Sequence, residues 1–242
     1  MPMMRDMRRA MVLILLLGLT ACDAQAKRSA TAIRKDAEKH MEFGRPADAQ
    51  VLFAELVERD PTRWYDQFSL GRAAMETGDL GQARMALEVA STLRPADHRI
   101  AVDLASVLFQ LEARDDLFRY LRDRAQTTQT PKDWLQLARY AMDCDDPDTA
   151  RLSVRIGIAL DEGETATPYL LAAQIARQLG EDADAKRALV LAWRADPENE
   201  QVNALLRDMG IVPGPTLQVP IGSSGDSTVD SAEGSAGDAS GR

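Results

Sequence analysis

Cysteine and histidine are scarce in this sequence, which has only Cys22, Cys144, His40 and His98 among 242 residues. A structural metal site needs about four such ligands at close and regular spacings, and these four are scattered along the chain. Neither histidine forms a motif with a nearby cysteine or carboxylate. The acidic neighbours of Cys144 should raise the pKa of its thiol, the opposite of what an activated nucleophile needs. We therefore expect no metal, no cofactor, no small-molecule substrate and no enzymatic activity.

Aromatic residues are also few, at 5% of the chain, whereas apolar residues make up 45% and alanine is abundant. This composition is typical of helices that approach one another closely through small side chains. The formal net charge is −9, and residues 1–21, with three arginines and one aspartate, carry +2, so that their removal would leave −11. Since phosphate binding depends on Lys and Arg, we expect no nucleic acid as a partner.

The first 22 residues resemble the signal peptide of a bacterial lipoprotein. Three arginines precede an apolar run at 10–19, which is too short to span a bilayer, and the run ends in Leu-Thr-Ala-Cys at 19–22. The resemblance implies that residues 1–21 are removed and that Cys22 becomes a lipidated N-terminus, anchored in a membrane. The alternative is an ordinary cleaved signal peptide in which Cys22 is incidental.

This resemblance also predicts where the protein resides. Residues 22–29 would form a short tether in the cell envelope, and Asp23 follows the lipidation site directly. In enteric bacteria, an aspartate at this place retains a lipoprotein in the inner membrane. We therefore expect the periplasmic face of the inner membrane, with the outer membrane as the alternative because the rule varies among bacteria.

Residues 64–97 contain two amphipathic helical patterns that meet at a turn. Gly78 suits the left-handed position just after the first helix, Asp79 can cap the second helix, and Pro95 ends it. Small residues such as Gly71 let the two helices come close. The unit is a helical hairpin that cannot bury its apolar face alone, so the sequence predicts further copies beside it.

Further copies appear at a spacing of 34 residues. Glycine, alanine and proline recur in register, at Gly44, Ala49 and Pro61, at Gly78, Ala83 and Pro95, and again three steps later at Gly180, Ala185 and Pro197. The period and these residue types resemble the tetratricopeptide repeat (TPR). The resemblance implies an all-α fold, an α-solenoid of about five TPR-like helix-turn-helix repeats with a C-terminal capping helix.

The predicted organisation follows this period. The repeats are expected at 30–63, 64–97, 98–130, 131–164 and 166–199, of which 98–130 is degenerate because its turn has no glycine and its closing proline is missing. A capping helix is expected at 200–210, where Asn199 can cap its start and its outer face is polar. Residues 211–242 are rich in Gly, Ser and Asp and predict a disordered acidic tail.

In the TPR family, the first helix of each repeat lines a groove that binds a peptide or a protein segment. Carrying the family's groove positions over gives a hypothetical binding surface at Phe68, Arg72, Met75, Val102, Phe109, Leu135, Arg139 and Met142. Methionine and aromatic side chains adapt to apolar peptide residues, and arginine can bind carbonyl or carboxylate oxygens. The alternative is that these apolar residues are ordinary core between repeats.

The predicted function is a membrane-anchored, non-catalytic scaffold of the bacterial cell envelope that binds a protein or peptide partner. A second hypothesis is a structural spacer in barrel-assembly, pilus or secretion, or cell-wall machinery, which would bind its neighbours through its convex face or its tail.

Overall fold

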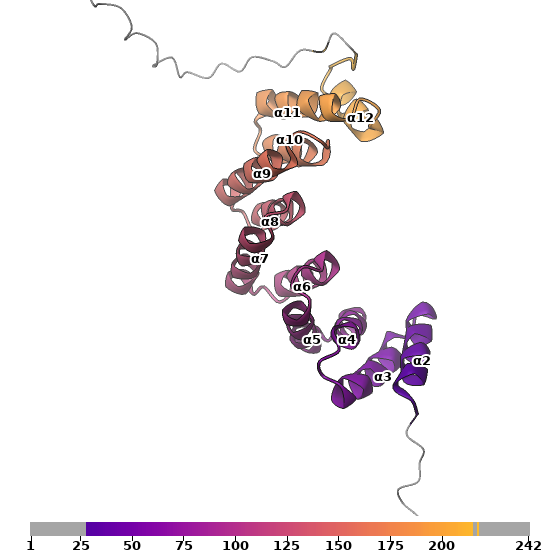
Figure 1. The fold of residues 1–242 in the computed structure, drawn as a ribbon. Coiled ribbons are helices and arrows are strands. Elements are labelled where there is room, and N and C mark those ends of the chain that lie inside the picture. The colour runs from indigo at the N-terminus through magenta and orange to yellow at the C-terminus, as the bar shows by residue number, and fades with distance from the viewer. Residues whose placement is uncertain (1–27, 215–216, 218–242) are drawn as a thin grey trace, which may run out of the picture. The chain divides into compact units, whose positions relative to one another are not determined.

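The computed structural model describes residues 28–214 and Leu217. The segment around Cys22 and most of the predicted tail lie outside these described residues. Between 28 and 214 the chain forms helices and no strands: α2 (Ala30–Glu42), α3 (Pro46–Arg59), α4 (Trp64–Thr77), α5 (Leu80–Leu93), α6 (His98–Gln110), α7 (Arg114–Thr128), α8 (Pro131–Asp143), α9 (Pro147–Asp161), α10 (Thr167–Gln178), α11 (Asp182–Ala195) and α12 (Glu200–Asp208) (Figure 1). In this part of the chain, no helix is both long enough and apolar enough to cross a membrane.

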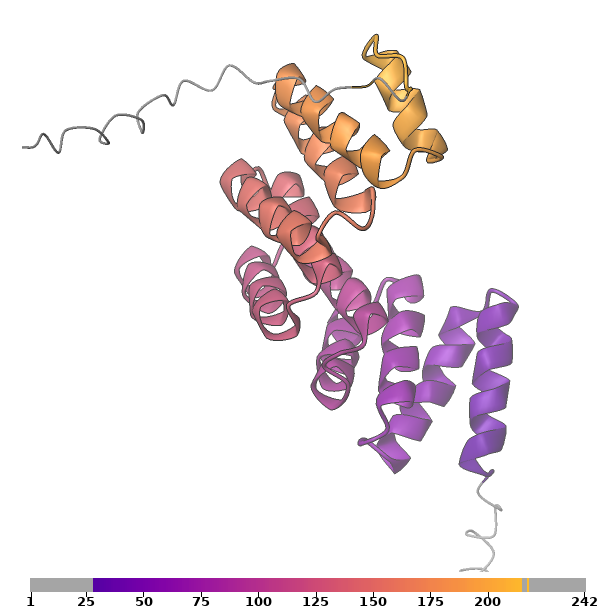
Figure 2. The same ribbon diagram turned by 45° about the horizontal axis from the view of Figure 1, so that its top comes forward.

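Eight of the described helices pair into four antiparallel hairpins, as four of the five predicted repeats require. α2 packs on α3, α4 on α5, α8 on α9, and α10 on α11, and α3 packs on α4 as extensively as on α2. In Figure 2 the indigo helices α2 and α3 lie side by side at the N-terminal end. At the C-terminal end, the orange helices α10 and α11 lie side by side in the same way. The described helices divide into two compact units, unit 1 up to Ala113 and unit 2 from Arg114. The predicted repeat 98–130 therefore contributes α6 to unit 1 and α7 to unit 2.

Local sequence signals end and start the helices as expected. Gly78 has a φ of 79° and lies just after α4, while the Asp79 side chain accepts a hydrogen bond of 3.0 Å from the backbone N–H of Gln82 at the start of α5. The side chain of Asn199 caps α12 in the same way, at 3.1 Å from the Val202 nitrogen. Between α6 and α7, where the sequence has no glycine, Glu112 adopts a left-handed φ of 55°.

Each unit has its own hydrophobic core, made of one face of each helix. The core of unit 1 contains Ile33, Ala37, Ala49, Phe53, Leu56, Leu70, Ala73 and Ala86. In unit 2, one cluster lies between α8, α9 and α10, and a second lies between α10, α11 and α12. Within each unit, neighbouring hairpins cover one another's apolar faces, so the repeats supply a core that none of them has alone.

Gly71 lets α4 and α5 approach each other more closely than any side chain would allow. A Cβ at this position would lie 2.6 Å from Cγ of Leu87, which is fully buried. We expect Gly71→Ala to lower the free energy of unfolding of unit 1 by about 1–3 kcal/mol, because the packed core cannot absorb the clash. Urea denaturation followed by hydrogen exchange of α4 and α5 peptides measures the effect.

The Gly71→Ala, Leu87→Ala double variant distinguishes the steric clash with Leu87 from the general effect of replacing a helical glycine on stability. Leu87→Ala alone leaves a cavity, and in the double variant the new methyl group occupies part of it. The double variant should therefore lose less stability than the two single losses added together. Simple additivity would contradict the close approach of the two helices.

Candidate functional site

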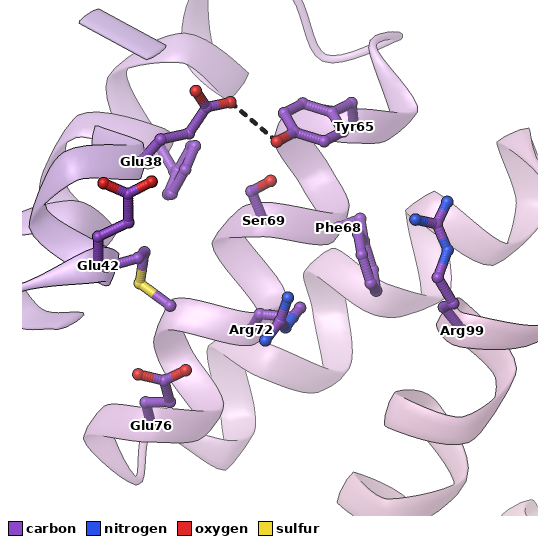
Figure 3. Close-up of a pocket in the computed structure, with 10 residues that line it drawn as sticks. Glu38, Glu42, Tyr65, Phe68, Ser69, Arg72, Glu76 and Arg99 are labelled. Atoms are coloured by element: carbon purple, nitrogen blue, oxygen red, sulfur yellow. Dashed lines mark hydrogen bonds between the residues drawn. The ribbon is translucent and has the colours of Figure 1, made fainter. Parts of the chain in front are cut away.

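Unit 1 has a cavity of about 440 Å³ on the side formed by α2, α4 and α6, with α3 beneath it. We call it the unit 1 pocket. Its lining consists of Glu38, Met41, Glu42, Phe53, Tyr65, Phe68, Ser69, Arg72, Glu76 and Arg99 (Figure 3). The first helix of three successive predicted repeats contributes to it, which is the face that the TPR resemblance predicts for binding.

The floor of the unit 1 pocket is apolar. Phe53 and Phe68 are only 1% and 6% exposed, and Met41 is half-buried beside them. The guanidinium carbons of Arg72 and Arg99 lie 6.0 and 5.8 Å from the centroid of the Phe68 ring. Phe68 is therefore held by the core below and by two cations at its sides, which gives the floor a fixed shape.

Three carboxylates, those of Glu38, Glu42 and Glu76, line one side of the pocket. In Figure 3 the two from α2 lie on the side away from Arg99. The Tyr65 hydroxyl donates a hydrogen bond of 2.8 Å to Oε1 of Glu38. Burial raises the pKa of Tyr65, and the bond to Glu38 raises it further, so the phenol stays protonated and holds Glu38 in place.

The two arginines of the pocket lie close to aspartates, whereas two of the carboxylates have no basic group within ion-pair distance in 28–214. Arg99 donates to both oxygens of Asp97, at 3.1 and 2.8 Å, and this contact lowers the pKa of Asp97. Nε of Arg72 lies 3.9 Å from Oδ2 of Asp103. Glu42 and Glu76 are exposed and form no ion pair with any residue in 28–214. The pocket thus has an excess of negative charge on its α2 side.

An ion pair behind the pocket fixes α4 against α2. Nε and Nη2 of Arg34 donate to the two oxygens of Asp66 at 2.7 and 2.8 Å, and Asp66 is 1% exposed. The hydrogen bonds to Asp66 are also the main reason that the pKa of Arg34 is raised. This bidentate contact joins the first helices of two successive repeats, so it sets the separation of the helices that line the pocket.

The structure distributes the predicted groove residues over both units. Phe68 and Arg72 line the unit 1 pocket, while Met75 is half-buried and Val102 and Phe109 are exposed at 41% and 39% without lining it.

In unit 2, Arg139 is exposed, Met142 packs against the core, and Leu135 is only 4% exposed within that core. Leu135 therefore acts as a core residue between α8 and α9 rather than as groove surface. The predicted lipidation site Cys22 lies outside the described residues.

Several residues that line the pocket could not be assigned to it from the sequence. Glu42 and Glu76 are separated by the same 34 residues as the repeats, and each directly follows a methionine, Met41 or Met75. That spacing is the one feature of the sequence that indicates that both glutamates occupy equivalent places in their repeats. Charged residues on a helix are usually solvated, however, and only the packing of α2, α4 and α6 shows that these two carboxylates face one cavity.

The placement of His, Cys, Asp and Glu side chains bears on whether the described residues could bind a metal ion or act as a nucleophile. Among the described residues, no group of three or more His, Cys, Asp or Glu side chains is arranged to hold a metal ion. Burial raises the pKa of the Cys144 thiol, and the nearby aspartates add to this. The residues of the unit 1 pocket can bind through apolar contact and charge, which suits a segment of polypeptide.

No family model matches the chain, and no curated protein matches it. Several solved structures are similar to it in fold. MamA from Desulfovibrio magneticus RS-1 (residues 41 to the end) has a TM-score of 0.55 at 13% identity, over 71% of this chain and 97% of that one. A second MamA structure has a TM-score of 0.55 at 16% identity, over 71% of this chain and 94% of that one.

The third similar structure is YrrB, described as a TPR protein with an unusual peptide-binding site. It has a TM-score of 0.51 at 15% identity, over 76% of this chain and 94% of that one. At these identities the likeness concerns the fold. Together with the helical hairpins and their 34-residue period, it shows that this chain has the fold of a tetratricopeptide-repeat α-solenoid.

Proposed function

We propose that this protein is a non-catalytic scaffold that holds a segment of a partner protein in the unit 1 pocket. The observation that supports the proposal best is the pocket itself, with its buried aromatic floor and its charged rim on the first helices of three predicted repeats. A rigid apolar floor provides affinity, and a charged rim provides selectivity. The peptide-binding site described for the TPR protein YrrB is consistent with this use of the fold.

We further propose that the scaffold is tethered to a membrane of the bacterial cell envelope through a lipid on Cys22. The support is the sequence alone: an arginine-rich start, a short apolar run, and Cys22 directly after it. With Asp23 next to the lipid, the periplasmic face of the inner membrane is the proposed location. A lipid tether would leave the pocket free to bind a partner in the periplasm.

A second candidate function has one specific observation in its favour. On α5, Met85, Val89 and Leu93 follow one another at intervals of four residues and are 64%, 41% and 39% exposed. Such a stripe on one face of a helix can bind a neighbouring protein. If this face carries the main contact, the protein is a structural spacer of a larger envelope complex and the pocket is secondary.

Photo-crosslinking at two positions separates the two functions. A photoreactive amino acid replaces Ser69, which lines the pocket, or Val89, on the exposed face of α5. After irradiation of the living bacterium that makes the protein, we expect at least about tenfold more of one defined adduct from position 69 than from position 89, because only the pocket encloses its partner. Quantitative mass spectrometry of the adducts measures this ratio.

The matched control carries the photoreactive residue at 69 together with Phe68→Ala, which removes the aromatic floor. The adduct should then fall strongly while circular dichroism still shows a helical protein. Equal adducts at 69 and 89, or an adduct at 89 alone, would favour the spacer and reject the pocket as the binding site.

A further inference from the structure

The charge of the unit 1 pocket indicates what kind of side chain enters it. Its two arginines each have an aspartate nearby, bidentate for Arg99 and at 3.9 Å for Arg72. Glu42 and Glu76 have no basic neighbour within ion-pair distance in 28–214. The whole chain has a net charge of −9 as well, so a cationic partner would be attracted before contact.

The shape of the pocket suits a long side chain with a charged end. The floor of Met41, Phe53 and Phe68 is apolar. It is lined by the carboxylates of Glu38 and Glu42 from α2 and of Glu76 from the C-terminal end of α4 (Figure 3). Lysine and arginine combine an apolar stem with a cationic head and bury the stem readily while the head stays at a polar surface. An acidic side chain would face three carboxylates, and a purely apolar one would leave them without a counter-charge.

We propose that the unit 1 pocket takes a lysine or arginine side chain of the partner protein, with its stem against Met41 and Phe68 and its head beside Glu42 and Glu76. This inference rests on the proposed function and adds the chemistry of the bound segment. Arg72 lies on the same helix as Glu76, one turn before it, and limits how far the cationic head can move toward α6.

A random twelve-residue peptide library displayed on phage tests the inference with the full chain as bait. We expect lysine or arginine, flanked by apolar residues, to be enriched at least about fivefold over the unselected library. The affinity of the selected peptides is then measured by fluorescence anisotropy. The Glu42→Gln, Glu76→Gln double variant should bind them about tenfold more weakly, because the charge-assisted contacts are lost while size and hydrogen-bonding capacity are kept.

Two further variants check the sign of the effect. Arg72→Gln removes a positive charge from the pocket, so basic peptides should bind a few-fold more tightly. Glu58→Gln, at an exposed position of α3 that does not line the pocket, should bind them as the unchanged protein does. Glu42 and Glu76 are exposed, so their substitution should leave the helices intact, and circular dichroism verifies this.

The outcomes distinguish this inference from the function on which it rests. Ser69→Trp, which places a large side chain in the pocket, tests whether the selected peptides bind there at all. Suppose that it blocks binding, but the peptides lack basic residues or bind the double glutamine variant unchanged. The pocket then binds peptides, and the inference is wrong. If no peptide is enriched, or if Ser69→Trp has no effect on those that are, both the inference and the proposed function fail.

Discussion

Asp66→Ala is expected to lower the free energy of unfolding of unit 1 by about 3–5 kcal/mol, because it leaves the Arg34 guanidinium without its bidentate partner. Asp66 is 1% exposed, and the side chain of Arg34 is 17% exposed, so water can replace only part of the lost contact. Asp66 also lies in the first turn of α4, where the helix dipole favours a negative charge. Hydrogen exchange of peptides from α2 and α4, measured across a series of urea concentrations, reports the unfolding of unit 1 separately from that of unit 2.

Asp36→Ala provides the control for this experiment. Asp36 forms an ion pair of 3.3 Å with Arg28, and both side chains are more than half exposed. Its loss should change stability by less than about 1 kcal/mol. The Arg34→Met, Asp66→Leu double variant should recover much of what Asp66→Ala loses, since it removes both charges together. Equal urea midpoints for Asp66→Ala and the unchanged protein would show that the ion pair does not hold α2 and α4 together.

Cys22→Ser is expected to move nearly all of the protein from the membrane fraction to the soluble fraction. Each buried CH₂ of an acyl chain contributes about 0.8 kcal/mol to membrane binding, and stable anchoring takes two or more chains. Serine has no thiol for the lipid attachment that the sequence predicts. Fractionation of the bacterial envelope, followed by detection of the protein in each fraction, measures the change.

The second cysteine offers a matched control, because Cys144→Ser makes the same chemical change at the end of α8. This variant should stay in the membrane fraction and should still incorporate a labelled fatty acid. If the unchanged protein is already soluble, Cys22 is incidental to an ordinary signal peptide. If Cys22→Ser stays membrane-bound, something other than a lipid on this residue attaches the protein.

Much of the fold was predictable because TPR hairpins are specified by local chemistry. A glycine with a positive φ after α4 and a side-chain cap on α5 depend on a few neighbouring residues, and both occur as predicted at Gly78 and Asp79. The division of the chain after Ala113 was not predicted. There the left-handed position is taken by Glu112, a residue type for which this conformation is unfavourable and which no local rule selects.

The site was predictable only in part, since a position in a repeat does not fix what its side chain packs against. Phe68 and Leu135 occupy equivalent repeat positions and are both buried, at 6% and 4% exposed, yet Phe68 lines the pocket and Leu135 lies in a core cluster of unit 2. In unit 2, Gly157 on α9 leaves room for Leu135: a Cβ there would lie 2.9 Å from Cδ2 of Leu135. Such a pairing between helices cannot be deduced from the spacing along one of them.

The buried ion pairs were missed for a related reason. Asp66 and Asp133 are each the third residue of their helix, and each is paired with an arginine, Arg34 at 2.7 Å and Arg124 at 2.9 Å. A single aspartate near a helix start is favourable on its own because of the helix dipole, so nothing in the sequence demands a partner. The partners become evident only when the neighbouring helices are in place.

Phe53 is part of the core of unit 1, where it is 1% exposed, and it also lines the unit 1 pocket. An occupant that rests on Phe53 therefore touches the same side chain that keeps α2 and α3 together. Binding and thermal resistance are then linked: a ligand at about one hundred times its dissociation constant adds about 2.7 kcal/mol to the folded state. The melting temperature of unit 1 can thus reveal its natural partner among many candidates, without any assumption about what that partner does.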